Sequence, residues 1–271
     1  MNKKRLFLSF VLITVLLLST TSFIHASNQN ELKSINYSTG DGARLIVHDF
    51  SDPITNADIE YVRNQAIDEF NSYLLSSGMN SLNDIKGYCI PEIPEGSVLI
   101  SYGYIINSEG KSSHYIGLAG DEYSANIIFN KAQTWYENKL SSRNQTNQYN
   151  PRGASWDWFD NITQDYYSSP YGGVTNNFNV YHLEEDGSSI YDWWAIEHFF
   201  AMEPGYKCYS SSYKNKSGIP EHDWSYGDET CDLASWGPLG TNTGEQQITV
   251  TLSASPSFGW TYTQPEVTTI D

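Results

Sequence analysis

The stretch Ser97-Val-Leu-Ile-Ser-Tyr-Gly-Tyr-Ile-Ile106 consists mainly of residues that favour β-strands. Asn107-Ser-Glu-Gly110 follows it with turn-forming residues, and a second strand-like run extends from Lys111 to Leu118. Two such runs around a short turn predict a β-hairpin. This hairpin decides the fold class, because the segments on either side of it have the pattern of helices.

Two amphipathic helices are predicted around the hairpin. Thr55 and Asp58 have the spacing of a capping box, and they open a helix over residues 56–77 that Gly78 ends. Its apolar face consists of Ile59, Val62, Ala66, Phe70 and Leu74. Gly120-Asp121 starts the second helix over residues 122–140. Its apolar face consists of Ala125, Ile128, Phe129, Ala132, Trp135, Tyr136 and Leu140.

These helices and a short strand at Ala43–Phe50 predict an α+β unit over residues 27–140, in which both helices pack on the same small sheet. Residues 141–151 have no apolar periodicity and are predicted to be a linker. Residues 152–271 hold seven of the eight tryptophans and show no helical period. They predict a β-rich unit that resembles an antiparallel sandwich.

Two elements of the β-rich unit have clear patterns. Phe178–Leu183 and Ile190–Met202 flank the turn signal Asp186-Gly187, which predicts a second hairpin. Near the C-terminus, apolar residues alternate with Thr and Ser from Ile248 to Tyr262. One phase is kept throughout, so this segment is either one long strand or a hairpin whose loop has an odd number of residues.

The N-terminus predicts export from the cytosol. Met1-Asn-Lys-Lys-Arg5 precedes a nearly unbroken apolar run from Leu6 to Leu18, and small and polar residues lead to Ala26. This is the layout of a signal peptide over residues 1–26. An uncleaved anchor is the alternative, although the apolar run reaches only about 20 Å as a helix against a hydrocarbon core of about 30 Å. We therefore expect a secreted protein or one retained at the cell surface.

The charge balance excludes one class of partner. The chain has 15 basic and 32 acidic residues, and removal of residues 1–26 leaves 12 basic residues and a net charge of −20. A surface this acidic repels phosphate backbones and anionic lipids, which argues against nucleic-acid binding. We expect surface glycans or envelope components as partners instead.

The three cysteines predict one disulfide in an oxidising compartment. Cys208 and Cys231 are the nearer pair, and their bond would stabilise the fold by about 3 kcal/mol in the chain-entropy model. Cys89 would then be a buried free thiol. A pairing that uses Cys89 stays open at this point.

The sequence argues against an enzyme, without settling the matter. It contains no Gly-x-Ser-x-Gly, His-Glu-x-x-His, phosphate-binding glycine loop or EF-hand loop. The histidines after residue 26 are scattered singly along the chain. Glu197 and His198 are adjacent in a predicted strand, so their side chains face opposite ways. No catalytic residue is assigned, and no cofactor is expected unless Ca²⁺ binds.

Four acidic residues are the candidate Ca²⁺ ligands. Asp223, Asp228, Glu229 and Asp232 lie around the predicted disulfide loop, and Ca²⁺ accepts six to eight oxygens in irregular geometry. A solvated acidic loop is the alternative interpretation of the same residues.

Aromatic residues suggest a second kind of site. Trp193, Trp194, Trp224 and Trp236 are candidates for a platform on which sugar rings stack. The alternative is that these rings fill a β-sandwich core, where each buries about 150–250 Å².

Four sequons mark candidate glycosylation sites in a glycosylating host. Their acceptor residues are Asn36, Asn144, Asn161 and Asn215.

The last third of the chain resembles a group of uncharacterised secreted prokaryotic β-rich proteins. The resemblance rests on Trp236-Gly-Pro-Leu-Gly240, the alternating strand from Ile248, and Gly259-Trp-Thr-Tyr-Thr-Gln-Pro-Glu-Val267. In those proteins further chain follows this segment, so the resemblance implies a shortened or divergent member. The expected sandwich also resembles leukocidin-like secreted pore formers, although this sequence has none of their stem or rim motifs.

The sequence therefore predicts a secreted, acidic, non-enzymatic protein of binding or recognition type. Two alternatives stay open. The alternating segment Ile248–Tyr262 has the pattern of a membrane-crossing hairpin in a pore-forming protein. The tryptophan-rich half has the composition of a carbohydrate-binding module.

Overall fold

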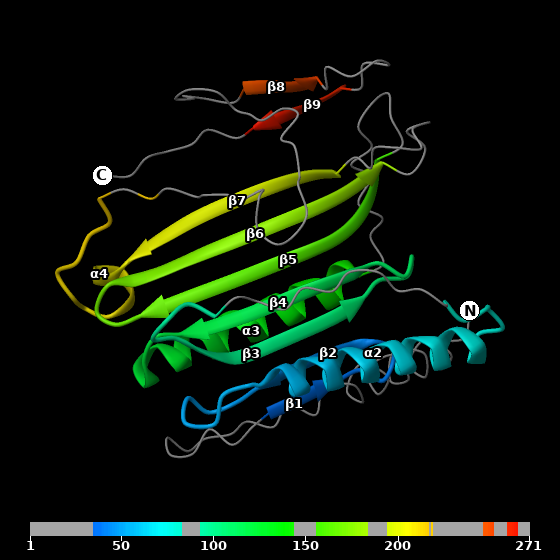
Figure 1. Cartoon of the computed structure of the whole chain (residues 1–271), viewed down its shortest axis with the longest axis horizontal. Helices are drawn as coiled ribbons and strands as arrows, with labels where there is room; N and C mark the ends of the chain where they lie inside the picture. Colours follow the sequence, from blue (N-terminus) through cyan, green and yellow to red (C-terminus); the bar gives the residue numbers. More distant parts are fainter. Residues whose placement is uncertain are drawn as a thin grey trace, which may run out of the picture. The chain divides into compact units, whose positions relative to one another are not determined.

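Seven strands, in chain order, form one mixed sheet in the computed structural model (Figure 1). The structure describes residues 35–82, 93–143, 156–183, 194–216, 218, 246–251 and 259–264. The strands of the sheet are β1 (Ile35–Ser38), β2 (Ala43–Val47), β3 (Val98–Ile106), β4 (Ser112–Ala119), β5 (Trp156–Ser168), β6 (Gly172–Leu183) and β7 (Trp194–Pro204). The described helices are α2 (Asn56–Ser76), α3 (Glu122–Ser142) and α4 (Gly205–Cys208).

All neighbouring strands of this sheet are antiparallel except β4 and β5, which are parallel. The predicted hairpin is confirmed as β3 and β4. The parallel pair follows from α3, which carries the chain back before β5 begins, as parallel strands require. Because β4 and β5 pair directly, the strands that follow the predicted linker continue the sheet of the N-terminal half. The fold is mixed α/β.

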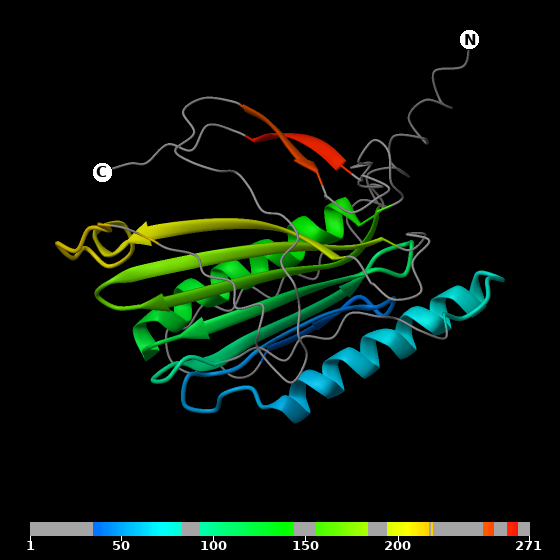
Figure 2. The same ribbon diagram turned by 45° about the horizontal axis from the view of Figure 1, so that its top comes forward.

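The two long helices pack on opposite faces of the sheet (Figure 2). The face under α2, called the α2 face below, contributes Ile46, Tyr102 and Ile116 to one apolar cluster with that helix. The other, the α3 face, contributes Leu45 and Tyr115 to a second cluster. The predicted contact of both helices with one sheet is thus confirmed.

The ends and faces of the helices follow the sequence pattern. The capping box at Thr55 and Asp58 is formed, and the buried residues of α2 are the five predicted. Gly78 has a φ of +76°, which ends α2 as expected. Asp121 caps α3 by accepting a hydrogen bond from the Ser124 backbone. Five of the predicted α3 residues are buried, and Phe129 and Leu140 are partly buried against the core.

Two glycines let α3 approach the sheet closely. A Cβ on Gly103 of β3 would lie 2.5 Å from the Trp135 ring, and one on Gly117 of β4 would lie 2.5 Å from the Ile128 side chain. Both contacts are closer than real Cβ atoms allow, so these positions require glycine for packing.

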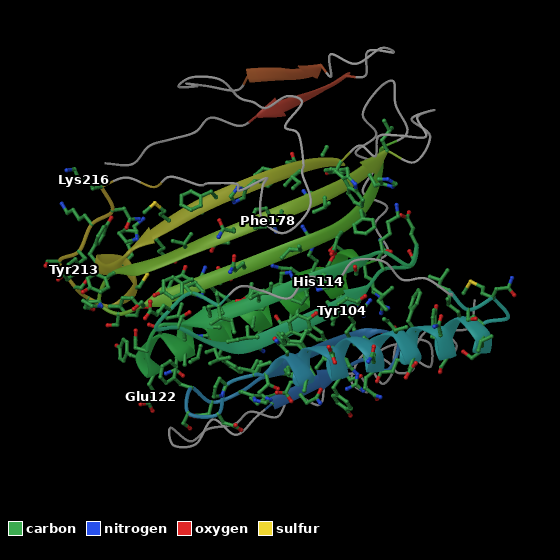
Figure 3. The ribbon with its side chains drawn as sticks, in the orientation of Figure 1. Tyr104, His114, Glu122, Phe178, Tyr213 and Lys216 are labelled. Atoms are coloured by element: carbon green, nitrogen blue, oxygen red, sulfur yellow. The ribbon has the colours of Figure 1, made fainter. Side chains whose placement is uncertain are left out.

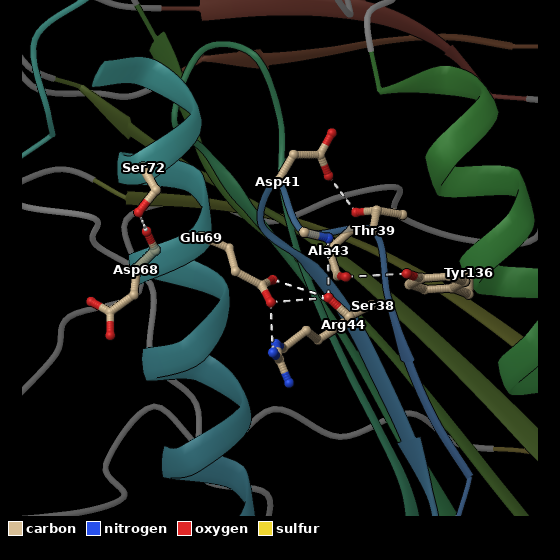
Figure 4. A network of polar contacts seen from close by, with 10 residues as sticks. Ser38, Thr39, Asp41, Ala43, Arg44, Asp68, Glu69, Ser72 and Tyr136 are labelled. Atoms are coloured by element: carbon tan, nitrogen blue, oxygen red, sulfur yellow. Dashed lines mark hydrogen bonds and ion pairs between the residues drawn. The ribbon is translucent and has the colours of Figure 1, made fainter. Parts of the chain in front are cut away.

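Polar contacts fasten the N-terminal edge of the sheet to both helices (Figure 4). The Arg44 guanidinium lies 2.6 Å from the Glu69 carboxylate of α2, and the Ser38 hydroxyl donates to the same carboxylate. On the other side, the Tyr136 hydroxyl of α3 donates to the Ala43 carbonyl. These bonds hold β1 and β2 in place between the helices.

The C-terminal half differs in part from the prediction. The strand expected at Phe178–Leu183 begins already at Gly172, and its partner β7 is half-buried or exposed along its whole length. A β-sandwich is not confirmed, because the described strands form one open sheet and one separate pair.

The separate pair consists of β8 (Gln246–Thr251) and β9 (Gly259–Gln264), which are antiparallel. Ile248 lies opposite Tyr262, and Val250 lies opposite Trp260. The alternating segment is therefore two strands. The residues between them, 252–258, are odd in number, as is required for the apolar residues of both strands to lie on the same face.

The predicted signal peptide at residues 1–26 lies outside the described residues. In the described part of the chain, neither long helix is apolar enough over its length to cross a lipid bilayer.

Candidate functional site

The candidate site lies on the α3 face of β5, β6 and β7. α3 packs against β2 to β5, and its Lys131 side chain extends to Glu203 of β7, but no long helix among the described elements packs along β6 and β7. The strand register places Asn161, Asn179 and Glu197 side by side across the three strands. The next positions in register are Asn177 of β6 and Phe199 of β7.

These side chains form a continuous hydrogen-bonded row. The Asn161 amide nitrogen lies 2.7 Å from Asn179 Oδ1 and 3.1 Å from Asn177 Oδ1. The Asn179 amide donates to Glu197 Oε2 at 3.0 Å. We call Asn161, Asn177, Asn179 and Glu197 the amide row. Their mutual bonds fix the orientation of each side chain.

The inner end of the amide row is bound by a lysine of α3. Lys139 Nζ donates to Asn161 Oδ1 at 2.8 Å. Burial lowers the Lys139 pKa to about 8, and the nearby Asp160 carboxylate offsets this only in part. Asn161 is only 3% exposed, so it belongs to the interior end of the row. Asn177, Asn179 and Glu197 are half-buried, and Phe199 is 49% exposed.

A second polar group lies further along the same face. Lys131 Nζ of α3 lies 3.8 Å from Asp165 Oδ1 and 3.9 Å from Glu203 Oε2. The Tyr115 hydroxyl donates to Asp165 at 2.9 Å, and the Tyr167 hydroxyl donates to Glu203 at 2.7 Å. Burial, followed by the Asp165 carboxylate, raises the Tyr115 pKa well above its usual value. The Lys131 ammonium thus lies between two carboxylates, each of which also accepts a hydrogen bond from one tyrosine hydroxyl.

A third polar cluster is buried on the α2 face. His114 Nε2 lies 3.1 Å from Asp160 Oδ2, and the Tyr102 hydroxyl lies 3.0 Å from His114 Nδ1. Figure 3 shows His114 beside Tyr104, whose ring meets it edge-on at 4.9 Å. The Ser112 hydroxyl donates to Asp160 rather than to His114. A nucleophile needs its base within hydrogen-bond reach, so this cluster has the geometry of a structural network.

Of the four tryptophans in the predicted platform, the structure describes Trp194. Trp194 is 46% exposed at the start of β7 and meets the Phe159 ring edge-on at 4.8 Å. Its register partner is His182, which places it on the α2 face, opposite the amide row. Trp193, Trp224 and Trp236 lie outside the described residues. The predicted Ca²⁺ ligands Asp223, Asp228, Glu229 and Asp232 do so as well.

The predicted disulfide is described at one end. Cys208 carries a free thiol in the structure, and Cys231 and Cys89 lie outside the described residues, so the pairing stays a prediction. Burial, and next the Glu203 carboxylate, raises the Cys208 pKa. A thiol in such surroundings is a poor nucleophile.

The described sequons differ in accessibility. Asn36 is exposed on β1, and Asn215 is half-buried after α4. The Asn161 amide is bonded within the amide row and is buried, which argues against a glycan at that position on the folded chain. Asn144 lies outside the described residues.

Sequence patterns do not indicate the amide row. They mark Asn161 only as a sequon, and they place Glu197 only as the neighbour of His198. The register does confirm that these two face opposite ways, because Glu197 pairs with Asn179 and His198 with Phe178. Asn177 and Asn179 are two residues apart, which is the spacing that places strand residues on one face, and this is the signal that could have indicated the site.

Comparisons with known proteins identify no relative of this chain. No family model matches the chain, and no curated protein or solved structure does.

Proposed function

We propose that this chain is a secreted, non-enzymatic recognition protein that binds carbohydrate through the amide row and Phe199. The single observation that carries the proposal is an exposed aromatic ring in register with a row of orientated amides and a carboxylate. The proposal retains the predicted function class and shifts the ligand surface from the tryptophans to the α3 face of β6 and β7.

The chemistry of these groups suits a sugar. Asn side chains offer both a donor and an acceptor, and a carboxylate accepts at two oxygens, so neighbouring sugar hydroxyls can be matched in pairs. Glu197 uses Oε2 for Asn179 and Tyr181, whereas Oε1 accepts no hydrogen bond from the described residues. Phe199 adds an aromatic face on which the C–H side of a sugar ring can pack.

Pre-orientation supports binding rather than a purely structural role. The row is fixed from one end by Lys139 and Asn161, so its outer members Asn179 and Glu197 are held before any ligand arrives. Groups held in this way lose less conformational freedom on binding, which increases affinity for a given set of contacts.

A glycan array with the secreted chain tests the proposal, followed by affinity measurement on the best ligand. We expect Phe199→Ala to weaken binding about tenfold, because one packed ring contributes on the order of 1–2 kcal/mol. Glu197→Gln should weaken it further without unfolding the protein. The matched control is Ile196→Ala, since Ile196 is 40% exposed on the same strand but on the opposite face.

Two results would refute carbohydrate binding at this site. One is a glycan array on which the protein binds no glycan. The other is equal affinity for Phe199→Ala and Ile196→Ala. A hydrolase screen on the array hits provides the remaining check, since turnover abolished by Glu197→Gln would make the protein an enzyme.

The pore-forming alternative rests on one observation. β8 and β9 form an antiparallel pair in which Ile248, Val250, Trp260 and Tyr262 are in register. Apolar and hydroxyl residues therefore alternate along each strand. This is the pattern of a membrane-crossing hairpin with one face toward lipid and the other toward water. Dye release from liposomes of several compositions tests this function, and the absence of release would exclude it.

A further inference from the structure

Four exposed tyrosines and three exposed lysines lie on the β5–β6 turn, on α4 and the residues that follow it, and on the first turn of α3. We call this surface the tyrosine–lysine corner. The tyrosines are 44–67% exposed, and the members of the corner are Tyr123, Tyr171, Tyr206, Tyr213, Lys207, Lys214 and Lys216. Figure 3 shows Tyr213, Lys216 and Glu122 at the same end of the sheet, with Lys216 on the β7 side and Glu122 at the start of α3.

The corner is held together by specific contacts. The rings of Tyr171 and Tyr213 meet edge-on at 5.0 Å, and the Tyr206 backbone N–H donates to the Tyr213 carbonyl at 3.0 Å. The Tyr123 ring lies 5.8 Å from that of Tyr209, whose hydroxyl is 2.8 Å from Ser124 Oγ. These contacts join α4 to both the β5–β6 turn and α3, so the corner is a built surface.

The lysines of the corner differ from the other basic residues of the described chain. Arg44 and Arg143 form ion pairs with Glu69 and Asp41, and Lys131 lies between two carboxylates. Lys139 donates to Asn161. Arg63 and Lys111 also have polar or electrostatic partners. In contrast, Lys207, Lys214 and Lys216 form no ion pair within the described residues.

The described acidic residues near the corner mostly have other partners. Asp121 accepts from the backbones of Ser124 and Ser169, and Glu203 is bonded to Tyr167 beside Lys131. Glu122 is the exception, because it is exposed in the first turn of α3 next to Tyr123. Among the residues that the structure describes, the corner thus presents positive charge outside any ion pair, on a chain of net charge −17.

We propose that the tyrosine–lysine corner binds an acidic polysaccharide, with the lysines contacting its carboxylates and the tyrosines packing against its sugar rings. Tyrosine combines an apolar ring with a hydroxyl, which suits a surface with both C–H and O–H groups. Lysine supplies a mobile point charge that tolerates variable spacing of carboxylates along a polymer.

The charge of the whole molecule favours a polymer strand over an anionic membrane. Electrostatic interactions fall off over about 8 Å at physiological salt, so a strand that touches only the corner is affected mainly by the corner. A bilayer is a plane, and it also approaches the acidic surface around the corner. In addition, α4 has only four residues and offers no amphipathic helix to insert.

Binding of the secreted chain to polygalacturonate tests the proposal, with the fully methyl-esterified polymer as the matched neutral ligand. We expect binding to the acid form and at least tenfold weaker binding to the ester. The triple substitution Lys207→Gln, Lys214→Gln and Lys216→Gln should weaken binding about tenfold, at the level expected for three exposed charge contacts. Higher salt should weaken wild-type binding and have less effect on the triple variant.

Three further variants distinguish the effect of the corner residues on binding from the effect of the protein's net charge. Asn56→Asp, Ala57→Glu and Asn64→Asp together add three negative charges at exposed positions of α2 and should leave binding nearly unchanged. Glu122→Gln should strengthen binding, because it removes the exposed carboxylate beside Tyr123. Tyr213→Ser should weaken it without a change in charge.

The proposal fails if the acid polymer does not bind, if the ester binds equally well, or if the α2 variant loses as much affinity as the lysine variant. Preferential binding to phosphatidylglycerol vesicles would replace the polysaccharide with a membrane. Because none of these residues belongs to the amide row, failure here leaves the glycan array result at Phe199 unaffected, and the reverse also holds.

Discussion

His114 of β4 and Asp160 of β5 are joined across the parallel strand pair, with His114 Nε2 3.1 Å from Asp160 Oδ2. Both residues are almost completely buried, and Asp160 also accepts from Ser112 Oγ and from the Asn161 backbone N–H. This carboxylate therefore accepts two hydrogen bonds and lies at ion-pair distance from a buried imidazole, at the point where the two antiparallel parts of the sheet meet.

Removal of the Asp160 carboxylate should destabilise the protein strongly. Asp160→Ala leaves several buried polar groups without their partner, and we expect the free energy of unfolding to fall by about 3 kcal/mol or more. Urea denaturation measures the change. Asp52→Ala, at an exposed loop position, is the control and should stay within about 0.5 kcal/mol of wild type. Equal stability of the two variants would show that the cluster contributes little.

Lys139 should make stability depend on pH above neutrality. Its folded-state pKa is about 8, below the usual value of 10.5, so between these pH values the unfolded chain binds more protons than the folded one. Stability should therefore rise with pH over this range, by about 3 kcal/mol from this group, and the penalty should be fully present below pH 8.

Lys139→Met tests this dependence. Urea denaturation at several pH values between 7.5 and 10 should show a smaller rise for Lys139→Met than for wild type. Lys216→Met also removes one positive charge, but at an exposed position, and it serves as the matched control. If stability rises with pH as steeply in Lys139→Met as in wild type, the interpretation of this half-buried amine is contradicted.

Gly103→Ala should be destabilising because its new methyl group meets the Trp135 ring. Overpacking of this kind costs about 1–3 kcal/mol. Trp135→Phe removes part of the ring, so the double variant should be more stable than the sum of the two single effects predicts. Additive effects in this double-mutant cycle would mean that the contact is relieved elsewhere.

The sequons should be used selectively in a glycosylating host. We expect a glycan on Asn36, which is exposed, and an unmodified Asn161 in folded, secreted protein, since that amide is buried within the amide row. Peptide mass spectrometry after enzymatic deglycosylation measures occupancy at each site. A high glycan occupancy of Asn161 in folded protein would contradict the described packing.

The N-terminal half could be predicted because its pattern is local. The five buried residues of α2 repeat at helical spacing, and Thr55 and Asp58 mark its start, so neighbours in sequence carry the information. The hairpin of β3 and β4 follows from turn chemistry in the same way.

The strand β5 could not be predicted from the sequence because its polar residues interrupt the alternation that is typical of a strand. Asp160, Asn161 and Asp165 disfavour strands in isolation. Each becomes acceptable only through a distant partner: His114 for Asp160, Lys139 for Asn161 and Tyr115 for Asp165. The amide row depends on the same strand, so both the junction and the candidate site emerge only after the sheet is assembled.

The parallel junction of β4 and β5 also has a kinetic consequence. Every other neighbouring pair in the seven-stranded sheet is antiparallel, and most of these pairs join strands close together in the chain, which is an arrangement that closes quickly. Alignment of β5 with β4 must wait until the intervening residues have coiled into α3 and settled against the sheet. We therefore expect this alignment to limit the overall rate of folding, and mutations in the α3 contact to slow refolding more than they accelerate unfolding.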